Sequence, residues 1–527
     1  MPTSTLSKGV PTDAANDSSE LPEQFRPKVR VVNNKSRDAE ISKPTPMPAP
    51  FKVALALFDG FMEPDKFVQL VVLGLTSHLI YLKYGSEQSS IEQGPMMLSV
   101  IAAYFVNVFL TASSSGIGED ALPPFNTIYL FYLQAALSIL FAPEYILLNT
   151  VLAFSISDLT LVLKIPLQMV FLLLTNNESS FVEISAKALV LNYFFIYGLY
   201  RASELKSLDK MECHMFAILC TNIVLLFKSD SIHFQVMRVC FTSFVIIVVI
   251  TTALRLVLKN LSLHQSARTI ILLPIIIIGF PYFIQKNLVI DGIAPFTWLL
   301  DYIGSSETRM SIMKTWLGSA LLLFPSVFTL KSNWSLNTSR KVWHFAVLPL
   351  LIPAIVLDTN FVKIALAGTV NLFLIVEYIR FLHIFPIGDY LDKHLRSFAD
   401  FRDEKGPIII SYLYFIIGIS LPFLLNGSVI GIVSLGVGDS LASIVGKKFG
   451  KRYWPNMSKT LEGTTAFILS TVATTLSLKM YLNFFPDISS LNLVIVCFLA
   501  GILEGHSTLN DNLLVPAFML IALEALK

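Results

Sequence analysis

Apolar residues dominate the chain in long runs that recur from residue 66 to residue 527. Many of these runs approach the roughly 20 residues that a helix needs to cross a bilayer. Because lipid offers the backbone no hydrogen-bond partner, a segment inside a membrane must satisfy its own N–H and C=O groups, as a helix does. The pattern therefore predicts an all-α, polytopic transmembrane bundle of roughly 14 to 17 membrane helices.

Polar residues divide this pattern into three regions. Residues 1–50 are rich in Pro, Ser, Asp, Glu and Lys and contain no stretch suited to a cleavable signal peptide, so we expect a disordered hydrophilic tail. In 51–335 the polar residues are scattered among transmembrane runs and form no recognisable motif. In 336–527 they gather in clusters at predicted helix ends, which favours a catalytic transmembrane region there.

Composition and charge agree with a membrane protein. Of 527 residues, 54% are hydrophobic and 14% are charged, whereas soluble proteins carry roughly 25% charged residues. The net charge of +2 and the confinement of basic residues to short loops argue against a nucleic-acid partner. The four cysteines include no CxxC pair, so we expect neither a sulfur-bound metal nor a disulfide framework.

Two clusters lie at the ends of the first two runs of this last region. Arg340, Lys341 and His344 share a helical face and are suited to holding phosphate oxygens, although such residues also anchor helices at a membrane surface. Glu377 and Arg380 are three residues apart and form either part of a site or a plain ion pair.

A third cluster begins with Asp439, which lies inside an otherwise apolar run. A carboxylate there costs about 2.5–3.5 kcal/mol on insertion scales, so the charge must be compensated. Gly438, Ala442 and Gly446 repeat every four residues and predict a face on which another backbone packs closely.

A basic loop follows this run and contains several cations and flexible glycines. Cations together with accessible backbone N–H groups suit a triphosphate, although a loop that fixes membrane orientation has the same composition. No GxxxxGK[ST] motif is present, so the loop is not a P-loop. Its cations are Lys447, Lys448, Lys451, Arg452 and Lys459.

The fourth cluster contains two carboxylates and two amides between the last two runs. Glu504 and Asp511 are suited to a divalent cation, and Asn510 and Asn512 to a base or sugar. A simple polar turn between helices remains the alternative.

The sequence resembles the dolichol kinase family at residues 438–440, 459–463 and 511–516. Shorter matches occur at Arg340-Lys341 with His344, at 377–380, at 402–404 and at Trp454-Pro455, so that the resemblance covers about 180 residues in the expected order. It implies CTP as phosphate donor, a divalent cation expected to be Mg²⁺, and dolichol or another polyprenol as acceptor. It also implies residence in the endoplasmic reticulum membrane and a role in protein glycosylation and GPI-anchor synthesis.

These patterns give the following expected roles. The catalytic candidates are Asp439, Lys459 and Glu462, and the metal candidates are Asp439, Glu504 and Asp511. Whether Asp439 acts as a base or as a metal ligand is left open. The candidates for holding the nucleotide are Arg340, Lys341, His344, Gly438, Ser440, Lys447, Lys448, Arg452, Thr460, Gly463, Asn510 and Asn512.

Pairs of apolar runs separate successive clusters, so each hairpin returns the chain to the side from which it started. All four clusters are therefore expected on one face, and the excess of Lys and Arg there predicts that this face is cytosolic. The alternatives are a CTP-dependent kinase of phytol or diacylglycerol, a CDP-lipid cytidylyltransferase, and a transporter with charges along its pathway. The pattern does not indicate an oligomeric state.

Overall fold

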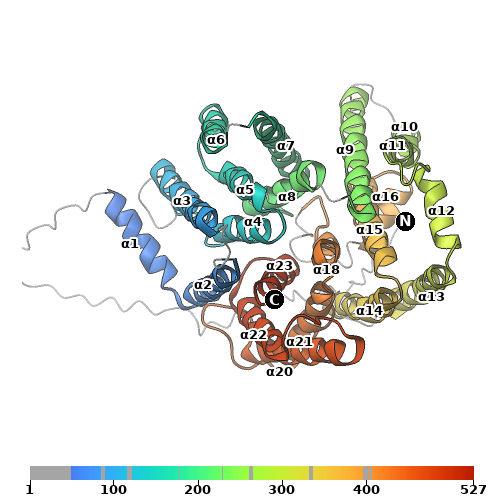
Figure 1. The fold of residues 1–527 in the computed structure, drawn as a ribbon. Helices are drawn as coiled ribbons and strands as arrows, with labels where there is room; N and C mark the ends of the chain where they lie inside the picture. Colours follow the sequence, from blue (N-terminus) through green and yellow to red (C-terminus); the bar gives the residue numbers. More distant parts are fainter. Residues whose placement is uncertain are drawn as a thin grey trace, which may run out of the picture. The chain divides into compact units, whose positions relative to one another are not determined.

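The computed structural model describes residues 49–84, 90–115, 122–176, 178–227, 230–259, 265–330, 336–395, 403 and 406–527. These residues belong to one compact unit, and almost all of its regular structure is helical (Figure 1). The all-α class predicted from the apolar runs is confirmed. The hydrophilic tail expected at 1–50 lies outside the described residues, except that α1 (Ala49–Phe61) begins at its end.

Eight of the described helices are long and apolar enough to cross a membrane, by length and composition. Six shorter apolar helices of 10–17 residues accompany them. The chain is thus a multi-pass membrane protein, and the predicted number of crossings requires the shorter helices to cross as well. The eight long segments are Pro64–Lys83, Ser179–Ser203, Ile232–Leu258, Ala267–Asn287, Arg340–Leu357, Thr359–Phe381, Ile430–Phe449 and Leu461–Leu482.

Helices α2 to α13 form the first part of the unit. Local signals set several of their ends: at the start of α8, Asp209 and Glu212 exchange side-chain to backbone hydrogen bonds of 2.7 and 3.0 Å in a capping box. The helices are α2 (Pro64–Tyr84), α3 (Ser90–Ser115), α4 (Thr127–Phe141), α5 (Ile146–Ala153), α6 (Leu161–Thr175), α7 (Ser179–Ser203), α8 (Lys210–Thr221), α9 (Ile232–Lys259), α10 (Gln265–Ile277), α11 (Gly279–Asn287), α12 (Pro295–Gly304) and α13 (Glu307–Leu330).

The second part contains the clusters singled out in the sequence. Between α19 and α20 the helix widens into a π-helical turn, Ser434–Asp439. The helices are α14 (Leu336–Leu357), α15 (Thr359–Phe381), α16 (Ile387–Leu395), α18 (Ser411–Asn426), α19 (Ile430–Val433), α20 (Ser440–Phe449), α21 (Leu461–Leu482), α22 (Ser490–His506) and α23 (Asp511–Ala525).

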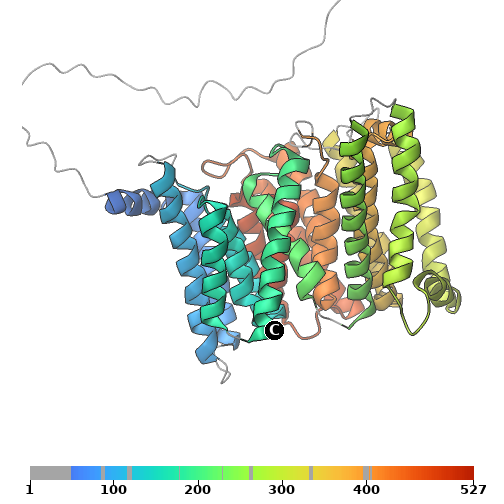
Figure 2. The same ribbon diagram turned by 90° about the horizontal axis from the view of Figure 1, so that it is seen from above.

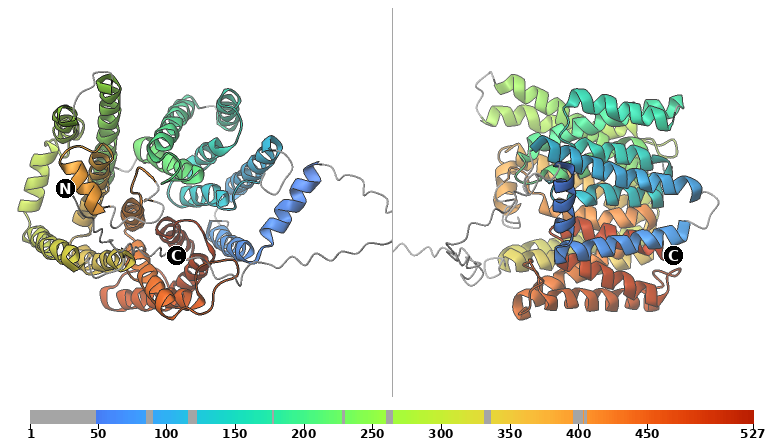
Figure 3. Two further views of the ribbon diagram at one scale, coloured as in Figure 1. Left: turned by 180° about the vertical axis from the view of Figure 1, so that it is seen from behind. Right: turned by 90° about the vertical axis from the view of Figure 1, so that its left-hand side faces the viewer.

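Helix α23 occupies the centre of the second part. Its residues 514–523 are buried without interruption, which is the pattern of a helix covered on every side. It contacts α18, α19 and α22 and also α2 and α4 from the first part, as Figures 1 and 3 show for the dark red helix. The two parts therefore share one core.

The polar clusters lie together at one end of the bundle. In Figure 2 the C-terminus is at the lower end and α16 at the upper end, so α23 begins at the upper end with Asp511. Arg380 closes α15 and contacts Asp392 of α16, and α14 starts at this same end because α14 and α15 form a hairpin. The single face predicted from the hairpins is confirmed within the bundle.

Candidate active site at one end of the bundle

Asp439 is the buried charge at the centre of the candidate site. It ends the π-helical turn and is only 7% exposed. Lys341 Nζ lies 2.5 Å and His344 Nδ1 lies 3.2 Å from its Oδ2 atom. A buried carboxylate is tolerated when it is paired, so Lys341 supplies the compensation that the sequence required. Widened helical turns of this kind are frequent at functional sites.

Helix α14 brings Lys341 and His344 to Asp439 from one face, because residues three apart lie side by side on a helix. The imidazole of His344 stacks on the ring of Phe415 in α18, with ring centres 4.1 Å apart, and Nδ1 also lies 3.3 Å from the Leu435 carbonyl oxygen. The first predicted cluster therefore borders the third one. In this structure the Lys341 ammonium of the first cluster pairs with the Asp439 carboxylate.

The small-residue face predicted at residues 438, 442 and 446 is confirmed, since α21 packs directly on it. A Cβ atom added to Gly438 would lie 2.6 Å from Thr471 Cγ2. A Cβ atom at Gly463 of α21 would lie 3.0 Å from the Ala442 carbonyl oxygen and 3.4 Å from the Gly446 Cα atom. Only small residues allow this approach, which fixes α20 against α21.

The basic loop between these helices is a small hairpin. The Trp454 N–H donates to the Lys459 carbonyl oxygen over 3.0 Å, and the Met457 N–H closes a turn on the Trp454 carbonyl oxygen at 3.1 Å. Pro455 and Asn456, the latter with a φ of 59°, are suited to the two central positions of a type II turn. The hairpin thus gives Lys459 a fixed position rather than leaving it on an open loop.

Lys459 joins the ends of α22 and α23. Its Nζ atom lies 2.7 Å from Glu504 Oε1, 2.7 Å from the Glu504 carbonyl oxygen and 3.6 Å from Asp511 Oδ2. Burial alone would lower the pKa of Lys459, but Glu504 and Asp511 raise it above its ordinary value, with a further contribution from Asp439. The Asp439 pair and the Lys459 pair are thus two charged groups on helices that pack together, since α21 contacts both α20 and α22.

The other predicted residues surround this centre. Ser440 is buried and its hydroxyl donates to the Leu435 carbonyl oxygen over 3.3 Å. Thr460 caps α21 by accepting the Gly463 N–H at 3.2 Å. Glu462 Oε2 accepts the Arg452 N–H at 3.3 Å, so its carboxylate lies by the hairpin, whereas Lys459 pairs with other carboxylates.

The remaining basic residues and amides differ in burial. Lys447, Lys448 and Arg452 are exposed at the end of α20 and in the hairpin, and Arg340 is half-buried at the start of α14. Asn510 caps α23 by accepting the Asn512 N–H at 3.0 Å. Asn512 is buried, and its Oδ1 atom has no hydrogen-bond partner among the residues that the structure describes. A buried acceptor of this kind is suited to a donor on a ligand.

The described residues contain no group of three or more His, Cys, Asp or Glu side chains arranged to hold a metal ion by themselves. Mg²⁺ commonly uses only one or two protein carboxylates and takes its other ligands from substrate phosphates and water. Glu504 Oε1 and Asp511 Oδ2 lie 2.7 and 3.6 Å from Lys459 Nζ, so these two carboxylates lie close together. This donor set fits a cation that binds together with a polyphosphate.

Sequence reasoning missed two parts of this arrangement. Phe415 lies in an apolar run and gave no signal, although it stacks on His344. The pairing of Lys341 with Asp439 was also missed, since we predicted a phosphate contact for Lys341. The compensation that a buried carboxylate requires, together with the few cations near helix ends, was the signal that could have found it.

The fold and the site define a polytopic membrane enzyme with its charged groups at one end of a helical bundle. Residues 24–228 match the dolichol kinase N-terminal domain. Dolichol kinase of Saccharomyces cerevisiae is 40% identical over 413 residues, which cover 77% of this chain and 78% of that protein. The chain belongs to the dolichol kinase family, as the motifs indicated.

More distant relatives agree. Dolichol kinase sec59 of Schizosaccharomyces pombe is 35% identical over 262 residues, covering 45% of this chain and 51% of that protein. Dolichol kinase of Homo sapiens is 31% identical over 261 residues, covering 44% and 48%. No solved structure matches the chain. The N-terminal match covers 24–50 of the expected hydrophilic tail and 51–228 of the region where we recognised no motif.

Proposed function

We propose that this protein is a CTP-dependent dolichol kinase, which transfers the γ-phosphate of CTP to the hydroxyl of dolichol. The observation that carries this proposal is the presence of two charged pairs, Lys341–Asp439 and Lys459–Glu504, at one end of the bundle in a member of this family. A nucleotide can arrive there from water while the isoprenoid tail of the acceptor stays in the bilayer. Dolichyl phosphate made there would serve protein glycosylation and GPI-anchor synthesis.

In this reaction the dolichol oxygen attacks the γ-phosphorus, the bond from phosphorus to the β-bridging oxygen breaks, and CDP leaves. Phosphoryl transfer depends mostly on positioning and on neutralising charge. Lys459, fixed by the hairpin, is placed to hold phosphate oxygens, and the exposed Lys447, Lys448 and Arg452 attract the triphosphate. The hydroxyl proton leaves to a base, and the buried carboxylate of Asp439 is the candidate for it.

Asp439, Glu504 and Asp511 are the residues that would hold a divalent cation. Mg²⁺ bound with CTP would neutralise charge on the phosphate oxygens. Asp439 has two possible roles, ligand or base, and its pairing with Lys341 suits both, because the ammonium keeps the carboxylate ionised until substrate arrives.

The test is phosphate transfer by purified protein in lipid, with a panel containing dolichol, shorter prenols, phytol and diacylglycerol. CTP labelled at the γ-phosphate and CTP labelled at the α-phosphate are used in parallel. We expect the γ-label alone to appear in dolichyl phosphate, and unlabelled ATP to compete poorly. Transfer of the α-label would instead identify a cytidylyltransferase, preferred labelling of diacylglycerol another lipid kinase, and no labelled lipid a non-enzyme such as a transporter.

We also propose that the site faces the cytosol from the endoplasmic reticulum membrane. Single cysteines at Asn456 and Thr508, both exposed at the site end, should react with an impermeant reagent in sealed microsomes. A cysteine at the exposed Ser489, at the start of α22, should react only after the vesicles are opened. The reverse labelling pattern would contradict this orientation.

A further inference from the structure

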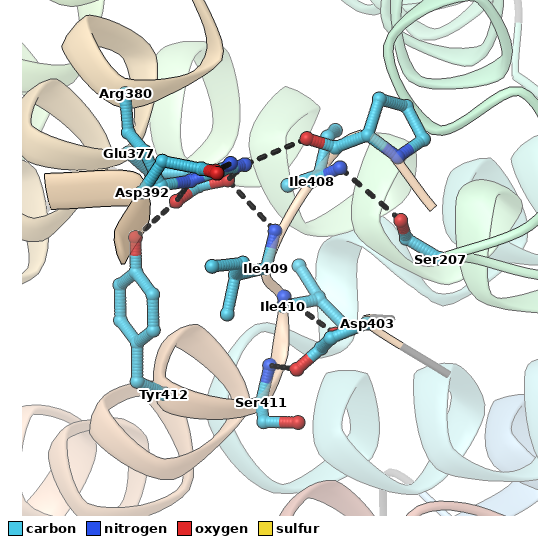
Figure 4. A network of polar contacts seen from close by, with 11 residues as sticks. Ser207, Glu377, Arg380, Asp392, Asp403, Ile408, Ile409, Ile410, Ser411 and Tyr412 are labelled. Carbon is cyan, nitrogen blue, oxygen red and sulfur yellow. Dashed lines mark hydrogen bonds and ion pairs between the residues drawn. The ribbon is translucent and has the colours of Figure 1, made fainter. Parts of the chain in front are cut away.

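A fully buried arginine lies beside the candidate site without touching it. Arg380 is 0% exposed, and its guanidinium lies 2.9 and 2.5 Å from the two oxygens of Glu377 and 2.6 Å from Asp392 Oδ1 (Figure 4). It also donates to the Pro407 carbonyl oxygen over 2.6 Å. A buried ion network contributes little net stability beyond what apolar packing would give. What it does provide is a fixed geometry for the groups that it joins.

This network holds the segment 407–412, which leads into α18. The two Glu377 oxygens that face Arg380 also accept the Ile409 N–H at 2.8 Å and the Tyr412 hydroxyl at 2.5 Å. The single carboxylate therefore ties the end of α15 to the start of α18. Each of its oxygens has both a cationic and a neutral donor, which leaves little freedom of orientation.

Asp403 and Ser207 also accept hydrogen bonds from this segment. Asp403 Oδ1 accepts the Ile410 N–H at 2.9 Å, and Oδ2 accepts the Ser411 N–H at 3.3 Å. The Ile408 N–H donates to Ser207 Oγ over 3.2 Å, from the loop between α7 and α8. Four successive backbone N–H groups, 408–411, thus donate to side chains from three other segments. Helix starts leave such donors unsatisfied, so these contacts fix where α18 begins.

The position of α18 affects both sides of the candidate site. One turn after Ser411, Phe415 stacks on His344, the residue that contacts Asp439. Further along, a Cβ atom at Gly418 would lie 2.1 Å from the carbonyl oxygen of Asn512, in the first turn of α23. A shift of α18 would therefore move the Phe415 ring and the start of α23 together.

We infer that the Glu377–Arg380–Asp403 network is a positioning device for phosphoryl transfer, which sets α18 so that Phe415 orients His344 on Asp439. Its residues are positioning residues, since the bonds described above join them to one another and to the segment 407–412. This inference rests on the proposed function for its kinetic consequence, although the orientation of Phe415 can be measured independently. It also gives the first part of the chain a contribution to catalysis, through Ser207.

A double-mutant cycle in the full-length protein tests the kinetic consequence. We expect Asp403→Asn to lower kcat/KM for label transfer about tenfold in the native background and less than about twofold in a Phe415→Leu background. Tyr412→Phe, which removes one hydroxyl, gives a milder version if Asp403→Asn folds poorly. Losses that simply multiply in the double variant would overturn the inference.

The matched control is Asp358→Asn at the opposite end of α15. Asp358 also caps a helix, accepting the Phe361 N–H at 2.9 Å, and also pairs with an arginine, Arg309, at 2.8 Å. The same substitution there should lower thermal stability while leaving kcat/KM per folded protein unchanged, and its effect should be independent of Phe415. A comparable kinetic loss at both ends would mean that the Asp403 effect is only structural.

A second readout does not depend on any activity. With 4-fluorophenylalanine at position 415, its ¹⁹F resonance reports the environment of the ring that stacks on His344. Asp403→Asn and Tyr412→Phe should shift or broaden this resonance, and Asp358→Asn should leave it in place. An unchanged resonance overturns the inference whichever lipid is phosphorylated. A shifted resonance in a protein that transfers no phosphate to dolichol supports the positioning contact and refutes only the proposed function.

Discussion

The two parts of the bundle hold their buried polar groups differently. In the first part they are mostly neutral: His214 lies between the Ser155 and Tyr200 hydroxyls at 2.8 and 2.9 Å. Asn149 and Asn222 exchange amide hydrogen bonds of 3.3 and 3.0 Å. Such contacts join helices in a membrane at about 0.6 kcal/mol each.

The second part instead buries opposite charges near one end, as in the pairs Lys341–Asp439 and Arg380–Glu377. Removing charges from water is far more costly than burying amides, and a broken pair is more costly still. Buried ion pairs therefore mark the candidate site, whereas neutral hydrogen bonds predominate where helices of the first part are held together. The residues that make these neutral contacts lie within the match to the family's N-terminal domain.

The largest expected effect is at Asp439. We expect Asp439→Asn to reduce phosphate transfer at least about a hundredfold, or about 2.7 kcal/mol of barrier, because the uncharged amide can be neither base nor strong ligand. Initial rates with γ-labelled CTP measure it. Activity within about threefold of wild type, under about 0.7 kcal/mol, would contradict the role.

The structure adds a control to that experiment. Asp439→Asn leaves the Lys341 ammonium buried without its partner, which destabilises proteins by roughly 3–5 kcal/mol. Combining Asp439→Asn with Lys341→Met removes both charges and should restore protein abundance without restoring transfer. A loss of activity that disappears with the restored abundance would show that Asp439 acts only on folding.

The second effect separates two lysines of the hairpin. Lys459→Ala should lower kcat/KM for CTP by about ten- to a hundredfold, since Lys459 is fixed by Glu504 and faces the carboxylate group. Lys451→Ala, which removes an exposed charge, should change it by less than about twofold. Equal losses measured over a range of CTP concentrations would mean that the phosphate contact lies elsewhere.

The third prediction tests the neutral part of the bundle. Tyr200→Phe removes one hydrogen bond to His214 and should lower stability by about 0.6 kcal/mol. Its kcat/KM per folded protein should stay within about twofold of wild type, because the contact only holds α7 against α8. Thermal unfolding in detergent and transfer rates measure the two quantities. A large kinetic loss at unchanged stability would place His214 in the reaction and remove the contrast between the two parts.

The smallest effect concerns pH. The raised pKa of Lys459 means that its charge is fully present below the ordinary lysine value of 10.5 and is lost only as the pH rises through the higher folded value. We therefore expect the pH–rate profiles of wild type and Lys459→Arg to have the same shape up to about pH 10, since arginine stays charged. An alkaline fall below that pH that Lys459→Arg abolishes would contradict the ion pairs at this residue.

The sequence predicted the class of fold because apolar runs in a membrane have few alternatives to helices. It also predicted the small-residue face that runs from the π-helical turn into α20, since the spacing of Gly438, Ala442 and Gly446 allows close packing wherever the partner lies. The hairpins placed the four clusters at one end without any knowledge of tertiary contacts. These predictions rest on local rules.

The pairings inside the site could not be predicted in the same way. Lys341 and Asp439 are 98 residues apart, and Lys459 and Glu504 are 45 apart, so their contacts depend on which helices pack together. Phe415 is an apolar residue among apolar residues, and nothing in its neighbourhood distinguishes it. A buried charge requires a partner of opposite charge, but only tertiary packing decides which residue that partner is.

The central position of α23 has a consequence for how the protein is made. This helix is translated after α2, α4, α18, α19 and α22, all of which it contacts. Those helices are therefore synthesised before α23, which fills the core between them. They cannot complete their packing until α23 has left the ribosome. Until then the bundle also lacks Asp511, which begins α23. A stop codon before residue 511 would leave a chain nearly complete in length whose other helices lack the helix around which they pack.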